Sequence, residues 1–102
     1  EKVFSEEVEE ALKLHPAVRD AAVIGAPDPR FGERICALIE LKQGALAPDL
    51  REIAVHVKAH LADYKAPRAL VIIESMGRAP NGKLDYKALK ARALAELGVQ
   101  VV

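Results

Sequence analysis

The fold of this 102-residue chain depends on how residues 77–83, Gly-Arg-Ala-Pro-Asn-Gly-Lys, are interpreted. An apolar run precedes them at residues 69–74, and its β-branched content is typical of a strand. A helical pattern follows, in which Asp85 is the expected N-cap residue. The apolar face of this third helix is expected to carry Tyr86, Leu89, Ala93 and Leu97. The stretch therefore connects a strand to a helix, and only residues 84–102 follow it.

The same stretch matches the first seven positions of the Walker A pattern, G-x-x-x-x-G-K, which binds nucleotide phosphates in P-loop proteins. That pattern continues with Ser or Thr, because the hydroxyl coordinates Mg²⁺, but Leu84 stands here. A P-loop domain also needs further β–α units to complete its sheet, and residues 84–102 are sufficient for one helix only. We therefore reject the P-loop interpretation. Spacing alone favours a solvated turn in which Lys83 is a surface charge, because short loops that contain a lysine are common.

Apolar spacing predicts three elements upstream. A first helix is expected from Ser5 to Pro16, with Val8, Ala11 and Leu12 on one face. Residues 18–25 form an apolar run that predicts a buried strand. A loop is expected at residues 27–32, and a second strand at residues 34–41 would complete a hairpin.

A second helix follows, with Pro48 expected in its first turn and an apolar stripe made of Leu50, Ile53, Ala54, Val57 and Leu61. Residues 63–67 are expected to return the chain to an extended run, which leads into a central strand at residues 69–74. The predicted order is αββαβα. The fold class is α+β, with a small three-stranded sheet and three packed helices in one domain.

The charge balance and the single cysteine limit the environment of the chain. Fifteen basic and fifteen acidic side chains give a formal net charge of +0, so no global positive field favours nucleic acid or an anionic membrane. Cys36 is the only cysteine, which excludes an intrachain disulfide and is typical of a reducing compartment. No apolar stretch is long enough to predict a transmembrane segment. We expect a cytoplasmic location.

Several segments, in order along the chain, resemble one protein family. Residues 3–12 are similar to N-V-Y-P-x-E-V-E-x-x-L, and residues 15–23 are similar to H-P-x-V-x-x-A-A-V. Residues 25–28 and the Gly32-Glu33 pair follow in the expected loop, and residues 61–67 resemble L-A-x-Y-K-x-P. Residues 76–89 contain the counterpart of the signature L-P-R-x-x-x-G-K. These motifs resemble the C-terminal domain shared by acyl-CoA synthetases, luciferases and the adenylation domains of peptide synthetases.

The resemblance covers residues 1–102, which it identifies as such a domain without the large N-terminal domain. The departures are Gly77 for Pro, Ala79 for Ser, Thr or Asn, Ser5 for Pro and Phe4 for Tyr, and none of them changes the Gly82-Lys83 pair. The closing motif is most similar to bacterial fatty-acyl-CoA synthetases. The resemblance therefore implies a fatty or other hydrophobic acid as substrate.

The resemblance implies a two-step ligase, in which a carboxylate and ATP form an acyl-adenylate and CoA then gives a thioester. ATP, Mg²⁺ and the acid would be held mainly by the N-terminal domain, the expected partner, so the chain alone is expected to be inactive. The catalytic lysine of the family falls on Lys83, which would stabilise the adenylation transition state. Gly82, Arg78 and Lys65 are candidate contacts for nucleotide or CoA, although Arg78 and Lys65 could equally be solvated charges.

Two alternatives to this function stay open. The first is an adenylation domain that loads a carrier protein, and the second is an isolated binding module without activity. His56 and His60 have the i, i+4 spacing of a metal-binding pair, but Val57 replaces the Glu of a zinc-protease motif, so we favour a structural role and expect no metal site. Asp28 and Glu33 are expected to shape the turn between the first two strands.

Overall fold

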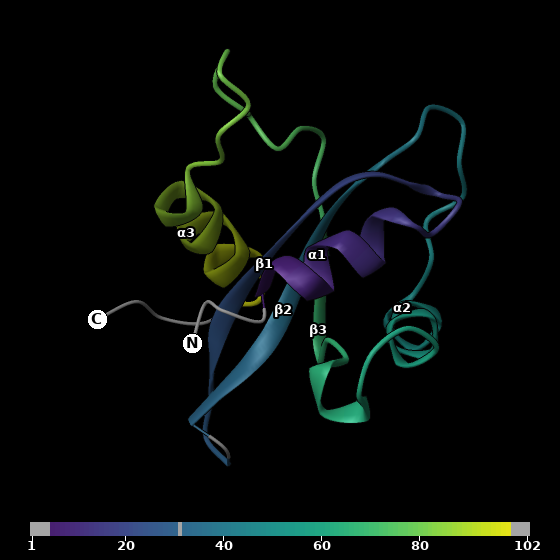
Figure 1. The fold of residues 1–102 in the computed structure, drawn as a ribbon. Helices are drawn as coiled ribbons and strands as arrows, with labels where there is room; N and C mark the ends of the chain where they lie inside the picture. Colours follow the sequence, from purple (N-terminus) through teal and green to yellow (C-terminus); the bar gives the residue numbers. More distant parts are fainter. Residues whose placement is uncertain (1–4, 31, 99–102) are drawn as a thin grey trace.

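The computed structural model describes residues 5–30 and 32–98 and has the predicted α+β fold (Figure 1). Its helices and strands follow the expected order αββαβα, with a short 3₁₀ turn, Asp63–Lys65, where an extended run was expected. The elements are α1 (Ser5–Lys13), β1 (Val18–Asp28), β2 (Gly32–Leu41), α2 (Leu50–Lys58), β3 (Ala69–Ile72) and α3 (Tyr86–Glu96).

The sheet has the order β1-β2-β3, and the predicted hairpin of β1 and β2 is confirmed. The two strands are antiparallel and longer than expected, because Pro27 and Asp28 pair with Glu33 and Gly32 inside the predicted loop. Pro27 is tolerated in β1 because an edge strand leaves one row of backbone groups outside the sheet.

The prediction that residues 69–74 form a central strand is wrong. β2 occupies the centre, and β3 pairs with it in parallel at the edge, with Leu38 opposite Val71. Burial alternates along this run, since Val71 and Ile73 are buried while Ile72 is 39% exposed. The β-branched apolar run favoured a central position, but one face of this edge strand is partly open.

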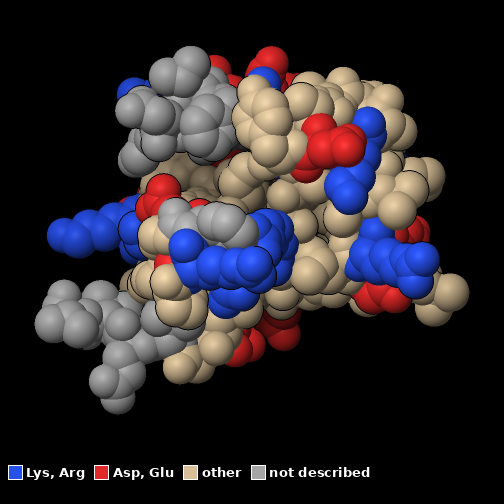
Figure 2. All heavy atoms as spheres, turned by 90° about the horizontal axis from the view of Figure 1, so that it is seen from below, with Lys and Arg blue, Asp and Glu red and all other residues tan. Residues whose placement is uncertain are grey.

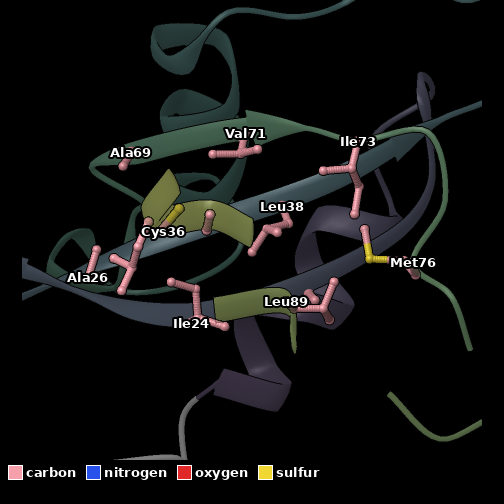
Figure 3. Close-up of a cluster of buried hydrophobic side chains, with 12 residues drawn as sticks. Ile24, Ala26, Cys36, Leu38, Ala69, Val71, Ile73, Met76 and Leu89 are labelled. Carbon is pink, nitrogen blue, oxygen red and sulfur yellow. The ribbon is translucent and has the colours of Figure 1, made fainter. Parts of the chain in front are cut away.

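Helices cover both faces of the sheet, and each face has its own apolar core (Figure 1). Val23 and Ile39 face α1 and α2, whereas Ile24 and Leu38, one residue away along each strand, face α3. Figure 3 shows the α3 side, where side chains of the three strands and α3 point into a common core. The labelled residues there are Ile24, Ala26, Cys36, Leu38, Ala69, Val71, Ile73, Met76 and Leu89.

Side-chain caps determine where α2 and α3 begin. Asp85 accepts a hydrogen bond from the backbone N–H of Ala88 at 3.1 Å, which confirms the predicted cap of α3. Asp49 caps α2 by accepting from the N–H of Glu52 at 2.8 Å, so Pro48 precedes the helix and the prediction that it lies in the first turn is wrong. An aspartate side chain can bond an otherwise unpaired N–H of the first turn, and this places the boundary at Asp49.

Candidate functional site

The candidate site is built on the segment that joins β3 to α3, which we call the Lys83 loop (residues 73–85). The loop projects beyond the sheet before it returns to α3 (Figure 1). Met76 anchors its first part, because its side chain is buried against α3 and its N–H donates to Glu40 at 3.0 Å. Residues 77–83 of the loop are exposed, so their main chain depends on local hydrogen bonds for a defined shape.

Three such hydrogen bonds shape the turn before Lys83. The N–H of Gly82 donates to the carbonyl of Ala79 at 2.7 Å, and the N–H of Ala79 donates to the carbonyl of Lys83 at 3.0 Å. The side chain of Asn81 accepts from the N–H of Lys83 at 3.0 Å. Gly82 has a φ of +85°, and no neighbouring atom lies within 4 Å of the position that a Cβ would take. Glycine is therefore favoured here by the backbone conformation and not by crowding within this chain.

The side chain of Lys83 is exposed at the end of this turn. Within residues 5–30 and 32–98, no hydrogen bond or ion pair involves its ammonium group. The main chain of Lys83 is thus fixed at both its N–H and its carbonyl, while its charge faces outward. This arrangement leaves the ammonium of Lys83 exposed to solvent.

A pocket of about 520 Å³ lies between α1 and the Lys83 loop, and we call it the α1–loop pocket. Helix α1 contributes three glutamates and one lysine, and the Lys83 loop contributes two of the three cations of the predicted site, Arg78 and Lys83. The lining residues are Glu6, Glu9, Glu10, Lys13, Arg78, Gly82, Lys83, Leu84 and Tyr86. Three carboxylates beside the cations make this pocket a poor site for a triphosphate, because like charges repel. A nucleotide bound here would need cationic groups from outside this pocket to neutralise its phosphates.

One of the glutamates that line this pocket, Glu9, is buried. Glu9 is only 6% exposed, and it accepts hydrogen bonds from the hydroxyl of Tyr86 at 2.8 Å and from the N–H of Val23 at 2.8 Å. Burial, followed by the hydrogen bond to Glu9, raises the pKa of Tyr86 to about 12. Sequence reasoning missed this contact, because Tyr86 was assigned to an apolar face and Glu9 is one of several glutamates in α1.

Arg78 is bound to Asp20 of β1 in a two-pronged ion pair. Its Nε donates to one carboxylate oxygen at 2.7 Å and its Nη2 donates to the other at 2.9 Å, while Nη1 donates to the carbonyl of Gly82. The hydrogen bond from Arg78 lowers the pKa of Asp20, although partial burial acts in the opposite direction. The structure thus places Arg78 with Gly82 and Lys83, and it adds Asp20, which the sequence did not indicate.

The structure does not bring Lys65 to the same place. Lys65 lies in the 3₁₀ turn before β3, whereas Lys83 follows β3, so the two residues lie toward opposite ends of that strand (Figure 1). The ammonium of Lys65 donates a hydrogen bond to Glu7 of α1, which raises the pKa of Lys65. Neither Lys65 nor Glu7 lines the α1–loop pocket.

The two helical histidines make contacts within the domain. Nε2 of His56 donates to the carbonyl of Ala11 at 2.6 Å, and Nδ1 of His60 donates to the carbonyl of His56 at 2.9 Å. The bond to Ala11 joins α2 to α1, in agreement with the structural role favoured above. Within the described ranges, no three His, Cys, Asp or Glu side chains lie close enough together to hold a metal ion.

The turn residues Asp28 and Glu33 also act within the fold. Asp28 accepts a hydrogen bond from the N–H of Arg30 at 2.8 Å, which confirms that it shapes the hairpin turn. The Glu33 side chain lies across Gly25, where an added Cβ would be 2.3 Å from the carboxyl carbon of Glu33. Gly25 therefore leaves room for this side chain.

The face shown in Figure 2 carries charges of both signs. Lysine and arginine side chains gather near the centre and at the right of this view, with acidic side chains beside them. None of the helices in the described part of the chain has the length and apolar character needed to cross a membrane.

Comparisons with known proteins identify the family of this domain. Residues 7–83 match the family model of the AMP-binding enzyme C-terminal domain. A medium/long-chain-fatty-acid–CoA/3-oxocholest-4-en-26-oate–CoA ligase of Mycolicibacterium smegmatis is 47% identical over 90 residues, which are 88% of this chain and 16% of that protein. A 3-oxocholest-4-en-26-oate–CoA ligase of Rhodococcus rhodochrous is 48% identical over the same shares.

Solved structures give the same result. An acyl-CoA synthetase of Brucella canis superposes with a TM-score of 0.81 at 33% identity, over 91% of this chain and 18% of that one. An amide bond synthetase of Marinactinospora thermotolerans superposes with a TM-score of 0.79 at 39% identity, over 88% of this chain and 18% of that one. The chain thus spans less than a fifth of the length of these relatives. It belongs to the family of AMP-binding enzyme C-terminal domains.

Proposed function

We propose that residues 1–102 are the C-terminal domain of an ATP-dependent acyl-CoA ligase that acts in the cytoplasm. Its partner would be an N-terminal domain of the same protein, which binds ATP and the carboxylic acid. Three features support this proposal: the family match, the ligase names of the relatives, and their much greater length. The mixed charge of the α1–loop pocket agrees with it, since that pocket lacks the groups to bind a triphosphate alone.

The proposed reaction has two steps. A carboxylate oxygen of the acid attacks the α-phosphorus of ATP, the bond to the bridging oxygen of the β-phosphate breaks, and acyl-adenylate and pyrophosphate result. The sulfur of CoA then attacks the acyl carbon, AMP leaves, and the thiol proton is released. Mg²⁺ would stabilise the phosphate charges when bound. We assign its ligands to the N-terminal domain together with ATP, because Mg²⁺ is usually bound by one or two carboxylates and by the phosphates of the nucleotide.

Lys83 is assigned to the first step. Negative charge grows on the phosphate oxygens as the carboxylate attacks, and an ammonium with three donors can stabilise that charge while holding both anions together. The observation that carries the assignment is the exposed ammonium of Lys83 on a turn whose main chain is hydrogen-bonded at residues 79, 82 and 83. A fixed turn reduces the entropy lost when the charge is positioned against a second domain.

The acid is proposed to be hydrophobic. The names of the Mycolicibacterium and Rhodococcus relatives give medium- and long-chain fatty acids and 3-oxocholest-4-en-26-oate, which are all carboxylates with a large apolar body. The similarity to an amide bond synthetase suggests that the acceptor can differ among relatives. We therefore attach the role of Lys83 to adenylate formation and not to the choice of thiol.

The test is a comparison of the two half-reactions in the complete ligase with Lys83→Ala. We expect ATP–pyrophosphate exchange to fall by about a hundred- to a thousandfold, the usual loss when one preorganised donor is removed. Thioester formation from supplied acyl-adenylate should stay close to the wild-type rate. Lys90→Ala removes another exposed lysine, in α3, and serves as the matched control that should leave both rates unchanged.

Two results would contradict the proposal. Equal losses in both half-reactions would show that Lys83 supports the protein as a whole and not the adenylation step. Unchanged exchange in the Lys83→Ala enzyme would show that the ammonium is a solvated surface charge.

A further inference from the structure

The ion pair of Arg78 and Asp20 connects the Lys83 loop to the sheet. Asp20 lies in β1, which pairs along its length with the central strand β2. Arg78 lies in the exposed part of the loop, five residues before Lys83. Its guanidinium reaches Asp20 with two nitrogens and the carbonyl of Gly82 with the third. The side chain of Arg78 thus connects β1 to Gly82, the residue before Lys83.

We propose that Asp20 is a positioning residue for adenylate formation, because it holds the Arg78 guanidinium that fixes the turn from which Lys83 projects. This inference rests on the proposed function of Lys83. It assigns Arg78 to the same positioning role, in place of the nucleotide or CoA contact considered from the sequence. Neither side chain then needs to touch a substrate.

The geometry around Asp20 supports this role. The pairing register of β1 and β2 shifts between Val18 and Asp20, and such irregularities in a strand redirect side chains. The Asp20 carboxylate is only 17% exposed, and it also accepts from the N–H of Ala21 at 2.9 Å. The hydrogen bond from Ala21 thus orients the Asp20 carboxylate in addition to the contact with Arg78.

The geometry of Arg78 supports it as well. An arginine has five N–H donors in a planar fork, and three of the Arg78 nitrogens are already engaged within the domain. Lysine has a single ammonium and cannot reproduce the paired contact to both carboxylate oxygens together with the bond to Gly82. The turn itself contains glycine at positions 77 and 82, both with positive φ, so its main chain relies on such contacts to keep one orientation.

The alternative is that Arg78 binds a phosphate of ATP or CoA directly. A direct contact predicts that loss of Arg78 raises the KM of the ligand concerned, whereas loss of Asp20 leaves Arg78 able to bind. If Asp20 and Arg78 act by positioning the turn, loss of either residue should lower the rate of the adenylation step by the same factor. The two residues should then behave as one unit when both are changed.

The experiment measures both half-reactions of the complete ligase for Asp20→Asn, Arg78→Gln and the double variant. Asn retains an oxygen that can accept from Ala21 but loses the charge and one acceptor for Arg78. Each single change should lower kcat for adenylate formation by about ten- to a hundredfold, the range expected when a catalytic group is misplaced by about 1 Å. The KM for ATP and the rate from supplied acyl-adenylate should change by less than about twofold, and the double variant should be no slower than the slower single variant.

Matched controls and a conservative variant separate positioning from other effects. Arg92 and Glu96 form an exposed pair on α3 at 3.9 Å, so Arg92→Gln and Glu96→Gln remove the same charges away from the loop and should leave both rates unchanged. Arg78→Lys keeps the charge without the fork. If Arg78 acts by positioning, this variant should be as slow as Arg78→Gln.

The outcomes are distinct. The proposal is overturned if Asp20→Asn behaves like the controls, if Arg78→Lys restores the rate, or if Arg78→Gln raises the KM for ATP or CoA. It is also overturned if Asp20→Asn slows both half-reactions equally, since that indicates a general structural role. Lys83→Ala is measured in parallel. A large loss there with wild-type behaviour of Asp20→Asn retains the proposed function and rejects only the positioning role, whereas no loss there rejects both.

Discussion

Charged side chains around the Lys83 loop fall into two groups at the scale of single residues. Glu9, Asp20 and Arg78 are engaged inside the domain by hydrogen bonds that fix their orientation. Lys83 has its main chain fixed and its ammonium exposed. A charge that must meet a group on another domain has to stay outside such internal pairs, because each pair would compete with that group.

Tyr86 gives a residue-scale prediction that depends on pH. Its pKa is raised from 10.0 to about 12 by burial and by Glu9, so the folded chain keeps the phenolic proton more strongly than the unfolded chain. The free energy of unfolding should therefore fall as pH rises from about 10 to about 12, and this fall should be smaller in Tyr86→Phe. Absorbance titration of the 102-residue chain, which contains only two tyrosines, should show a high-pH step that Tyr86→Phe removes. Persistence of that step in the variant would contradict the assignment.

At the scale of elements, apolar periodicity predicted all six helices and strands in the correct order. Boundaries and neighbours were harder to predict, because they depend on contacts between distant residues. The cap at Asp49 moved the start of α2 past Pro48, and the hairpin ladder extended β1 to Asp28. Strand order could not follow from the apolar run at 69–74, since the same run fits a central strand and a strand that α3 covers on one face.

The candidate site, too, was predicted from the sequence only where it depends on neighbouring residues. The position of Lys83 on a loop between a strand and a helix followed from the sequence, because local turn residues determine it. The partner of Arg78 did not, since Asp20 is 58 residues away and only the folded sheet brings them together. For the same reason the sequence grouped Lys65 with Arg78, although the 3₁₀ turn and α1 hold Lys65 toward the other end of β3.

The start of α3 gives the prediction at this scale. Asp85 caps the helix two residues after Lys83, so Asp85→Ala removes the acceptor of the Ala88 N–H. The free energy of unfolding should fall by about 1 kcal/mol, the usual cost of losing an N-cap. Urea unfolding of the 102-residue chain followed by circular dichroism measures this loss. Asp85→Asn keeps a capping oxygen and should retain most of the stability, and equal losses in both variants would show that the cap is not the cause.

The whole molecule has the dimensions of an independent domain, with a radius of gyration of 12.8 Å for its Cα atoms. This equals the value of about 13 Å expected for a compact chain of about 100 residues. Two apolar cores on opposite faces of one sheet support the same conclusion. We therefore expect the 102-residue chain to fold alone, and its circular dichroism spectrum should show its helices.

The last prediction concerns this separate domain. The α1–loop pocket brings three glutamates next to Arg78 and Lys83, so the chain alone should not hold ATP in a reactive position and should catalyse no ATP–pyrophosphate exchange. Addition of the separately expressed N-terminal domain should restore exchange in proportion to the concentration of the 102-residue chain, because the two parts must associate before reaction. The Lys83→Ala chain should fold and restore about a hundred- to a thousandfold less exchange, whereas the Arg92→Gln chain should restore as much as the wild type. Exchange by the chain alone would place the nucleotide site within these residues, and the assignment of Lys83 to a site shared between two domains would then be wrong.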